Sequence, residues 1–549
     1  MARRTAPAGP VRHPVAIVGA GPVGLAMAID LATRGIASVV LDEDETVATG
    51  SRAICWAKRT LDIFDRLGIG ERVVGKGVTW KLGRVFHGER EIDTIDLLPE
   101  DGHRRPAFVN LQQPYVETYL VERAADFPDL VDIRWRHRVT GLETRPDSVA
   151  LALDTPDGPA RLDAAWVVAA DGARSAVRQM LGLSFEGPRF DEQFLIADLR
   201  VGRDGPGERR FWFRPPFDPA ESVLMHRQPD DVVRIDFQLG PDADPVREKE
   251  PERVLARARR VLGDEAGPLE LVWCSVYRFR CARTERFVHG RVILVGDAAH
   301  VVSPFGARGG NGGIQDVDNL AWKLALVCRG EAPPSLVASY DDERGRGADE
   351  NIRHSARTTA FMTPKSPVER AFRDAVLTLA ADHPFARRLV NGGRLSKPCS
   401  LDGLALQTPD DGRVGQALAA GSACPDAPVT GPDGREGWLL DRLGHGFVAL
   451  VFAGPDGTAP EGWQALPPAI RPLLVLPADA RPAEDAPFAT ILDRSGHVRA
   501  RYGGRPGSAY LIRPDQHVAA GFAAFDPAAL AAAHRRATGQ PADRGREAA

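Results

Sequence analysis

The sequence predicts an α/β protein with more than one domain, and three observations carry this prediction. An apolar run at Val15–Val18 leads into a glycine-rich turn and then a helical stretch, the pattern of a strand–turn–helix unit. Strand and helix signals alternate onward and resume at Arg291–Val295, as in a parallel sheet covered by helices. Between about Phe190 and Phe279 the segments are β-rich and aromatic. A second, smaller sheet is therefore inserted in the first domain.

Length and composition bound the class of protein. A chain of 549 residues is too long for one core, so two or three domains are expected. The formal net charge of -4 is spread along the chain, which argues against a nucleic-acid surface. Six cysteines form no C-x-x-C pair, which suits a reducing compartment. The pair Arg3-Arg4 begins no convincing export signal, because Pro and Gly interrupt the residues after it, and no run of about 18 apolar residues occurs. We expect a cytoplasmic protein with no membrane partner.

The first domain opens with a strand, a glycine turn, a helix and a second strand over residues 15–41. Gly35 is a suitable helix stop, and Ser38–Leu41 is the second strand. The inserted sheet is expected over 189–282, between the two parts of the first domain at 1–188 and 283–395. Its predicted strands are Phe194–Val201, Arg210–Phe213, Val232–Leu239 and Leu271–Phe279.

The α/β pattern returns with a buried strand at Arg291–Val295, and we expect a helix from about Ile314 to Cys328. A helical stretch to about Leu389 then precedes a polar linker around Ser396–Asp411. The remaining domain, 396–549, carries predicted strands and a closing helix that begins at Asp526-Pro527, a suitable N-cap and first-turn pair. Those strands are Phe447–Phe452, Leu473–Leu476, Phe488–Leu492 and Ser508–Ile512.

The first glycine motif has the chemistry of a dinucleotide site. A pyrophosphate needs close backbone approach and a helix N-terminus directed at it, which the turn supplies. Its candidate residues are Gly19, Gly21, Pro22 and Gly24. Asp42, followed by Glu43, ends the next strand about 20 residues on, where an acid accepts a ribose hydroxyl. A carboxylate there favours FAD or NAD over NADP, and this motif alone does not separate the first two.

Two later motifs favour a flavin. Asp171-Gly172-Ala173-Arg174-Ser175 follows a strand, and Gly296-Asp297 ends another, where an acid faces the ligand crevice of an α/β sheet. The loop beyond, Ser303–Gly313, contains Pro304. Its residues Gly309, Gly310 and Asn311 would bring backbone N–H groups and a positive helix end to one point, which suits the flavin edge that becomes negative on reduction.

With Gln113–Glu117 and Gly312–Leu324, these motifs resemble the class A FAD-dependent aromatic hydroxylases. The chain is most similar to the long members, typified by 3-(3-hydroxyphenyl)propionate hydroxylase, phenol hydroxylase and the aromatic polyketide hydroxylases. The resemblance spans about 13–390. It implies a Rossmann-like FAD-binding domain of the para-hydroxybenzoate hydroxylase type, an inserted substrate sheet, and a thioredoxin-like C-terminal domain without C-x-x-C.

The resemblance also implies residue roles. Gly19, Gly21 and Gly24 would hold the pyrophosphate, and Asp42 the adenosine ribose, where many relatives have Glu. Arg52 and Gln113 would reach the pyrophosphate and ribitol region. The remaining cofactor contacts implied are Asp171 near the FAD, Gly296 and Asp297 at the ribitol, Pro304 beside the isoalloxazine, and Gly310 and Asn311 at its pyrimidine edge.

The implied reaction begins with hydride transfer from NADH or NADPH, bound transiently, to FAD. Oxygen then adds to give a C4a-hydroperoxide, which hydroxylates a small phenolic substrate. Substrate-side candidates on the inserted sheet include Trp212, Phe237 and Phe279. Arg234 lies in a strand that carries a substrate-side arginine in relatives. Either His226 or Tyr277 could relay the phenolic proton, whereas His300 fits a structural contact better.

Several alternatives stay open. A polyketide-tailoring or Baeyer–Villiger oxygenase shares the scaffold. So do the Rab GDP-dissociation inhibitors, which use no flavin, although the glycine-rich loop after Asp297 counts against them. Flavin-dependent halogenases are disfavoured because the W-x-W-x-I-P motif is missing. We expect the C-terminal domain to act in packing or dimerisation, and the resemblance allows a homodimer. The sequence does not distinguish NADH from NADPH.

Overall fold

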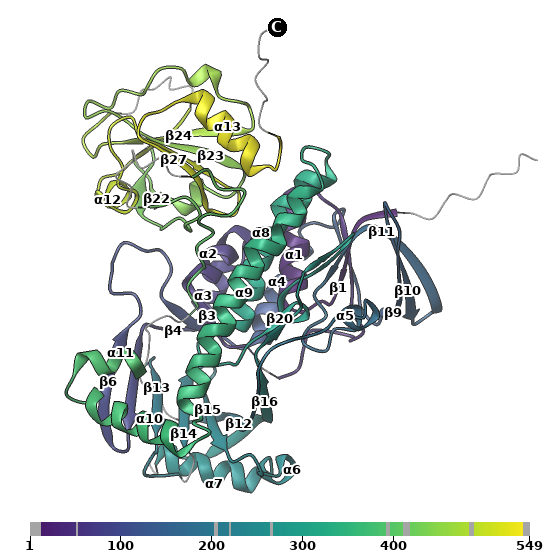
Figure 1. Cartoon of the computed structure of the whole chain (residues 1–549), viewed down its shortest axis with the longest axis vertical. Coiled ribbons are helices and arrows are strands. Elements are labelled where there is room, and N and C mark those ends of the chain that lie inside the picture. The colour runs from purple at the N-terminus through teal and green to yellow at the C-terminus, as the bar shows by residue number, and fades with distance from the viewer. Residues whose placement is uncertain are drawn as a thin grey trace, which may run out of the picture.

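The computed structural model describes residues 12–50, 53–202, 207–218, 221–263, 267–390, 396–409, 418–481 and 488–541. Figure 1 shows three lobes. The sheet packed on helices α1 and α4 lies in the middle, the second sheet lies at the lower end, and the C-terminal lobe lies at the upper end, beside helix α8. Among the described helices, none is long and apolar enough to cross a membrane.

The first sheet is parallel at its centre, in the order β18-β19-β11-β1-β2-β8. Its strands are β1 (Arg12–Val18), β2 (Ser38–Leu41), β8 (Val131–Arg134), β11 (Gly158–Ala169), β19 (Val292–Leu294) and β18 (Val288–His289), with β9 (Arg138–Thr144) and β10 (Val149–Thr155) extending antiparallel from β11. Val18 lies opposite both Leu41 and Ala169, and Ala169 lies opposite Leu294. The carboxyl ends of β1, β2, β11 and β19 therefore meet at one edge, and all three predicted motifs begin there.

Helices cover this sheet. They include α1 (Pro22–Thr33), α2 (Lys58–Leu67), α3 (Gly70–Lys76), α4 (Gln113–Ala124), α5 (Ala176–Met180) and α8 (Gly309–Cys328). The middle of α1 is buried because it is packed between the sheet and α8, with Leu25, Ile29 and Leu31 wholly inaccessible. Such apolar burial is the main stabilising term of a layered α/β domain.

The second sheet is larger than predicted. Its order is β16-β12-β15-β14-β13-β5-β6, and the predicted insertion supplies β12 (Arg189–Val201), β13 (Arg209–Phe213), β14 (Ser222–Arg227), β15 (Val232–Leu239) and β16 (Leu269–Arg280). The strands β5 (Leu82–His87) and β6 (Arg90–Asp96) come from the segment assigned to the first domain. They join because Phe211 of β13 lies opposite Val85 in a parallel pair, a pairing that local patterns do not reveal. The predicted domain boundary at residue 189 therefore does not coincide with the limit of the sheet, which also contains two strands from before that residue.

The two faces of the second sheet differ. One face packs on α7 (Pro251–Leu262) through side chains such as Leu195, Val223 and Phe237. The other carries Phe194 and Leu224, which pack with Phe305 from the loop before α8 and with Met362 at the end of α9 (Ser335–Met362). We call this second face the inner face. The helices α10 (Pro367–Ala380) and α11 (Pro384–Val390) complete the same cluster.

Shorter elements join these parts. A three-stranded sheet holds β3 (Cys55–Ala57), β7 (Phe108–Asn110) and β4 (Val78–Trp80) in that order. The strands β17 (Ala282–Arg283) and β20 (His300–Val301) pair with each other, a 3-10 turn, η2, spans Gly296–Ala298, and α6 (Pro245–Glu248) precedes α7.

The C-terminal lobe has the strand order β22-β21-β25-β24-β23-β26-β27. The strands β23 (Phe447–Phe452), β24 (Ile470–Leu476) and β25 (Ala489–Leu492) run parallel, whereas β26 (Ala509–Ile512) is antiparallel to β23, and β27 (Val518–Phe522) is antiparallel to β26. This is a thioredoxin-like arrangement, as expected. Also present are β21 (Pro428–Thr430), β22 (Glu436–Trp438), α12 (His497–Tyr502), α13 (Pro527–Ala537) and the 3-10 turns η3 (Leu440–Arg442) and η4 (Trp463–Ala465). Asp526 caps α13 as predicted. All six cysteines are free thiols.

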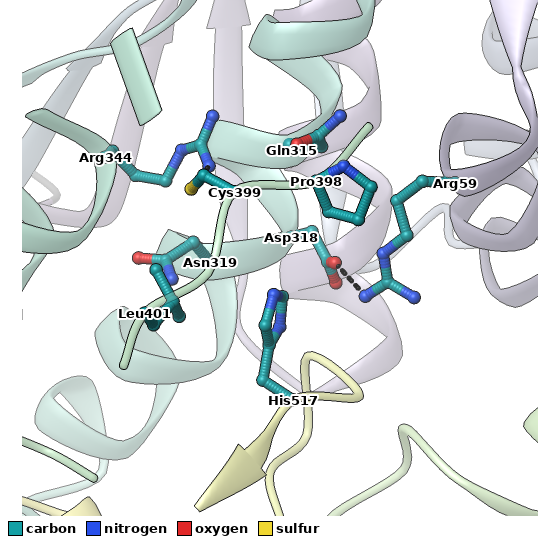
Figure 2. Close-up of a pocket in the computed structure, with 9 residues that line it drawn as sticks. All are labelled: Arg59, Gln315, Asp318, Asn319, Arg344, Pro398, Cys399, Leu401 and His517. Atoms are coloured by element: carbon teal, nitrogen blue, oxygen red, sulfur yellow. Dashed lines mark hydrogen bonds and ion pairs between the residues drawn. The ribbon is translucent and has the colours of Figure 1, made fainter. Parts of the chain in front are cut away.

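The C-terminal lobe joins the first domain through buried charges. The interdomain ion cluster consists of Lys323 on α8, Glu343 on α9, and Arg513 and Asp515 between β26 and β27. Beside it, Arg59 and Arg66 of α2 both contact Asp318. Figure 2 shows the small cavity, of about 10 Å³, that remains among Arg59, Asp318, His517 and the linker residues around Cys399. The two domains are therefore closely packed at this junction.

Candidate functional site

The glycine turn after β1 leaves room for a ligand at one position only. Gly19 adopts a φ of +104°, and a Cβ there would lie 2.6 Å from the carbonyl oxygen of Ala170. A Cβ at Gly24 would lie 1.9 Å from the carbonyl oxygen of Gly19, so both positions require glycine for packing. A Cβ at Gly21 would meet no described atom within 4 Å. Pro22 begins α1, whose start has no side-chain cap, so its positive end is open to an anion.

Asp42 lies directly beside this turn. Its carboxylate accepts hydrogen bonds from the backbone N–H groups of Ala20 and Asp44. Burial raises the pKa of Asp42, and the two backbone N–H groups oppose that rise. Glu43 is exposed on the following loop. The acid is thus placed between the pyrophosphate turn and the β2 edge, where a ribose would lie.

Gln113 and Glu117 of α4 bind the backbone at Ala53 and Ala48. The Ala53 N–H donates to Gln113 Oε1 over 3.1 Å, Gln113 Nε2 donates to Glu117 Oε1 over 2.8 Å, and the Ala48 N–H donates to Glu117 Oε2 over 2.9 Å. Arg52 itself lies outside the described residues. Gln113 therefore positions the backbone at Ala53, a role that the sequence did not indicate. Its contact with the pyrophosphate and ribitol region stays a prediction.

The second motif forms a turn at the end of β11. Asp171 Oδ2 accepts the Val177 N–H over 3.0 Å, whereas Oδ1 is buried without a hydrogen-bond partner in the described chain. Burial raises the pKa of Asp171. Arg178 links this motif to the third, because its Nη1 donates to the Ala298 carbonyl over 2.9 Å. An unsatisfied buried carboxylate oxygen at this edge fits a ligand hydroxyl or amide.

The loop from Ser303 leads to α8, which begins at Gly309 and not at Ile314 as predicted. Gly309, Gly310 and Asn311 form the first turn of the helix, and the Asn311 side chain binds the backbone of β3. Its Oδ1 accepts the Ala57 N–H over 2.9 Å, and its Nδ2 donates to the Cys55 carbonyl over 2.8 Å. The Asn311 side chain is thus committed to β3, so a flavin contact there falls to backbone N–H groups. No side chain caps α8.

Around this helix start, Asp297 and Pro304 are exposed while Phe305 is buried. Gly296 has a φ of +57°, and its N–H donates to Asp316 Oδ2 over 2.9 Å. The same carboxylate binds His300 Nε2 at 2.8 Å and Arg344 Nε at 2.6 Å. These two partners lower the pKa of Asp316 against the effect of burial. His300 is therefore a structural contact, as the sequence favoured.

These observations fit an extended dinucleotide. Two uncapped helix starts, α1 and α8, face the edge where Gly21, Asp42, Asp171 and Asp297 meet. The space at Gly21 and the unsatisfied Oδ1 of Asp171 both suit a ligand of this kind. FAD bound here would have its pyrophosphate at α1 and its isoalloxazine near Pro304 and α8. In the described part of the chain, no group of three metal-binding side chains occurs.

The inner face of the second sheet carries a polar row beside β3. Arg234 of β15 lies opposite Asp198 of β12 and His226 of β14. Arg234 binds Asp198 in a bidentate pair, both contacts being 2.8 Å, and its side chain is 4% exposed. Cys55 Sγ of β3 lies 3.9 Å from both His226 ring nitrogens. Because Cys55 is also tethered by Asn311, this row adjoins the predicted flavin edge.

Burial shifts the pKa values of three side chains in this region. Burial lowers the pKa of His226 well below its usual value, and the nearby Arg209 and Arg234 lower it further. Asp236, two residues beyond Arg234, has its pKa raised by burial to about 7, although both arginines oppose this. Burial also raises the pKa of the Cys55 thiol to about 12, so the thiol stays protonated at neutral pH.

Two sequence candidates lie on the face opposite the inner face, and a third, Tyr277, lies opposite Phe194 at the sheet edge. Phe237 and Trp212 point to the opposite face, where Phe237 is fully buried in the α7 cluster and Trp212 stacks on Phe86 at 5.2 Å. Both were wrong as pocket residues, because alternate residues of a strand face opposite sides. Tyr277 is 44% exposed on the edge strand β16, 5.3 Å from the Phe279 ring. Phe279 itself packs in the inner cluster with Phe305.

Sequence reasoning missed Arg209, Asp236 and Cys55. A signal was present for Asp236, since Val232–Leu239 alternates apolar and polar residues and so places Asp236 on the same face as Arg234. Cys55 and Arg209 had none, because only the packing of β3 on the inner face brings them to the same place.

A family model described as an FAD binding domain matches residues 12–355. The chain belongs to this family. A 3-(3-hydroxy-phenyl)propionate/3-hydroxycinnamic acid hydroxylase from Mycolicibacterium smegmatis is 29% identical over 524 residues, which cover 92% of this chain and 90% of the relative. A flavin-dependent monooxygenase from Mycobacteroides abscessus is 34% identical over 357 residues, 60% of this chain and 70% of the relative.

Solved structures agree in fold. The flavin-dependent monooxygenase PieE, solved with FAD and substrate, has a TM-score of 0.80 at 23% identity and covers 97% of this chain and all of its own. The anhydrotetracycline hydroxylase OxyS from Streptomyces rimosus has a TM-score of 0.70 at 26% identity and the same coverage. FAD is therefore the cofactor, and the predicted class, the FAD-dependent aromatic hydroxylases, is confirmed. The non-enzymatic alternative is set aside.

Proposed function

We propose that the chain hydroxylates a small phenolic substrate, using FAD, NADH or NADPH as transient reductant, and O2. The observation that carries this proposal is that the start of α8, where the flavin edge is expected, adjoins the polar row on the inner face. Asn311, at the start of α8, binds both Cys55 and Ala57 of β3, and β3 faces the polar row of Arg234 and His226. A substrate on the inner face would thus lie against the flavin edge.

The residues divide the work. FAD, when bound, would carry the electrons supplied by NADH or NADPH and provide the activated oxygen. The backbone N–H groups at the start of α8 stabilise negative charge on the cofactor. The buried aromatic side chains Phe194, Phe279 and Phe305 exclude water from the inner face, which strengthens every electrostatic contact there. The Arg234–Asp198 pair fixes the polar end of the pocket.

A second candidate is a polyketide-tailoring oxygenase. It is favoured by the similarity to OxyS over nearly the whole chain, a protein whose name denotes a polycyclic substrate. A Baeyer–Villiger reaction on the same scaffold would be recognised by a lactone product in place of a new ring hydroxyl.

The deciding experiment measures NADH and NADPH consumption by the purified flavoprotein. The phenol panel includes 3-(3-hydroxyphenyl)propionate, the substrate named for the relatives, and one polycyclic phenol, with products analysed by mass. Stimulated consumption with the gain of one oxygen atom supports the proposal and names the substrate class. A phenol that stimulates NADH or NADPH consumption but yields only hydrogen peroxide is an effector and not a substrate. No response to any monocyclic phenol, with oxygenation of the polycyclic one, favours the tailoring reaction.

A further inference from the structure

One buried acid on the inner face has no assigned role. Asp236 is 8% exposed and lies between apolar partners, Ile196 on β12 and Leu224 on β14. Its Oδ1 is buried and has no hydrogen-bond partner in the described chain. A buried carboxylate oxygen without a donor costs free energy, so a donor supplied by a bound ligand would stabilise it.

The groups that face Asp236 come from its own strand and from four others. Arg234 on its own strand binds Asp198 of β12 through both guanidinium contacts, and its charge lowers the pKa of Asp236 against the larger effect of burial. Arg209 of β13 is half-buried, and the structure gives it no hydrogen bond or salt bridge among the described residues. His226 of β14 and the Cys55 thiol of β3 complete the surroundings. Asp236 and Arg209 are thus a base and a cation for which the described residues supply no hydrogen bond or ion pair, although Arg209 lies over the Phe211 ring at 6.0 Å.

We infer that Asp236 accepts the proton of the substrate's phenolic hydroxyl and that Arg209 faces the phenolate that results. This inference rests on the proposed function. The phenol O–H bond breaks, an O–H bond forms at Asp236, and the electron pair stays on the phenolate oxygen, where it enriches the ring for attack by electrophilic oxygen. After oxygen transfer, the hydroxylated carbon releases its hydrogen to solvent as a proton, the C–H electron pair returns to the ring, and the ring regains aromaticity. The proton on Asp236 then returns to the phenolate oxygen.

The two sequence candidates for this role fit less well. The neutral, buried ring of His226 lies among positive charges, so it is a weak proton acceptor. Tyr277 lies at the exposed edge strand. Asp236, with a pKa of about 7, has the basicity that proton transfer at neutral pH favours.

The test compares Asp236→Asn with Asp231→Asn in the FAD-bound enzyme. Asp231 is exposed at the β14–β15 turn with a φ of 57°, a conformation that Asn tolerates, so it serves as a matched control. With 3-(3-hydroxyphenyl)propionate, kcat of the wild type and of Asp231→Asn should rise with pH around pH 7. Asp236→Asn should retain FAD, lose this rise and lose about 10²- to 10⁴-fold in kcat, and Asp236→Glu should recover part of the loss.

A second readout requires no turnover. The absorbance difference of 3-(3-hydroxyphenyl)propionate on the oxidised enzyme reports its ionised fraction, which should grow around pH 7 in the wild type and vanish in Asp236→Asn. An unchanged pH profile in Asp236→Asn, or loss of the profile in His226→Gln instead, would overturn the inference. If Asp236→Asn does not fold, a wild-type complex that shows no ionisation of the phenol between about pH 6 and pH 8.5, the range that brackets the pKa of Asp236, overturns it as well. Oxygenation that fails in the wild type while the ionisation is present would count against the proposed function alone.

Discussion

Removing Arg513 should destabilise the whole enzyme, because its charge is balanced only inside the interdomain ion cluster. The guanidinium contacts Glu343 at 2.6 and 2.8 Å and Asp515 Oδ1 at 3.0 Å, and all three side chains are at most 1% exposed. Arg513→Met keeps most of the volume but leaves Glu343 with Lys323 and Asp515 with His517 as their ion-pair partners. Breaking a buried pair in this way costs about 3–5 kcal/mol.

The assay is urea unfolding of the FAD-bound enzyme, followed by tryptophan emission and flavin release. Trp322 is a local reporter, because its Nε1 donates to Asp515 Oδ2 over 3.1 Å. The control is Arg435→Met, which removes an ion pair with Asp433 whose arginine is 87% exposed, and exposed pairs contribute little. Arg513→Met should unfold at a clearly lower urea concentration. Equal midpoints for the two variants would refute the claim that the cluster holds the domains together.

Three further outcomes are expected. Gly21→Val should fold but lose FAD, measured as the flavin-to-protein ratio, because its side chain enters the space left for the cofactor; retention of full FAD would contradict that placement. Asn311→Ala removes hydrogen bonds to Ala57, Cys55 and Ala307, and should weaken FAD binding about 10-fold or more, at about 1–3 kcal/mol for each unsatisfied group; titration of the apoprotein with FAD checks this. The pKa of Asp236 is about 7 in the folded state against an ordinary value of 3.8, so the folded state binds more protons between these values, and stability should fall as pH rises from about 4 to 7. Urea midpoints at both pH values should show this loss in the wild type and not in Asp236→Asn.

The meeting of the three motifs at one sheet edge could be predicted because each motif directly follows a strand of the same parallel sheet. Gly19, Gly21 and Asp42 each follow a strand end at a spacing fixed by the strand–turn–helix unit, and parallel pairing then brings the motifs of β1 and β11 together. The sequence also predicts β23, β24, β25 and β26 of the C-terminal lobe to within a few residues, since Phe447–Phe452, for example, is a continuous apolar run, but it does not predict β21, β22 or β27.

The substrate side could not be predicted because it depends on register and distant pairing. Whether Phe237 or Asp236 lies on the inner face is decided by a one-residue choice along β15. The parallel pairing of β13 with β5 joins segments that are far apart in the sequence. Likewise, no local pattern connects Arg513 to Glu343, which are 170 residues apart.

The interdomain ion cluster has a consequence for how the enzyme is made. Synthesis proceeds from the N-terminus, and domains generally fold in that order. Lys323 and Glu343 leave the ribosome long before Arg513 and Asp515, so the helices α8 and α9 wait without their final partners. The same α8 begins at the flavin edge. A chain whose synthesis stops before this point therefore lacks the turn between β26 and β27. We expect such a chain to bind FAD poorly, so that the active enzyme consists of full-length molecules.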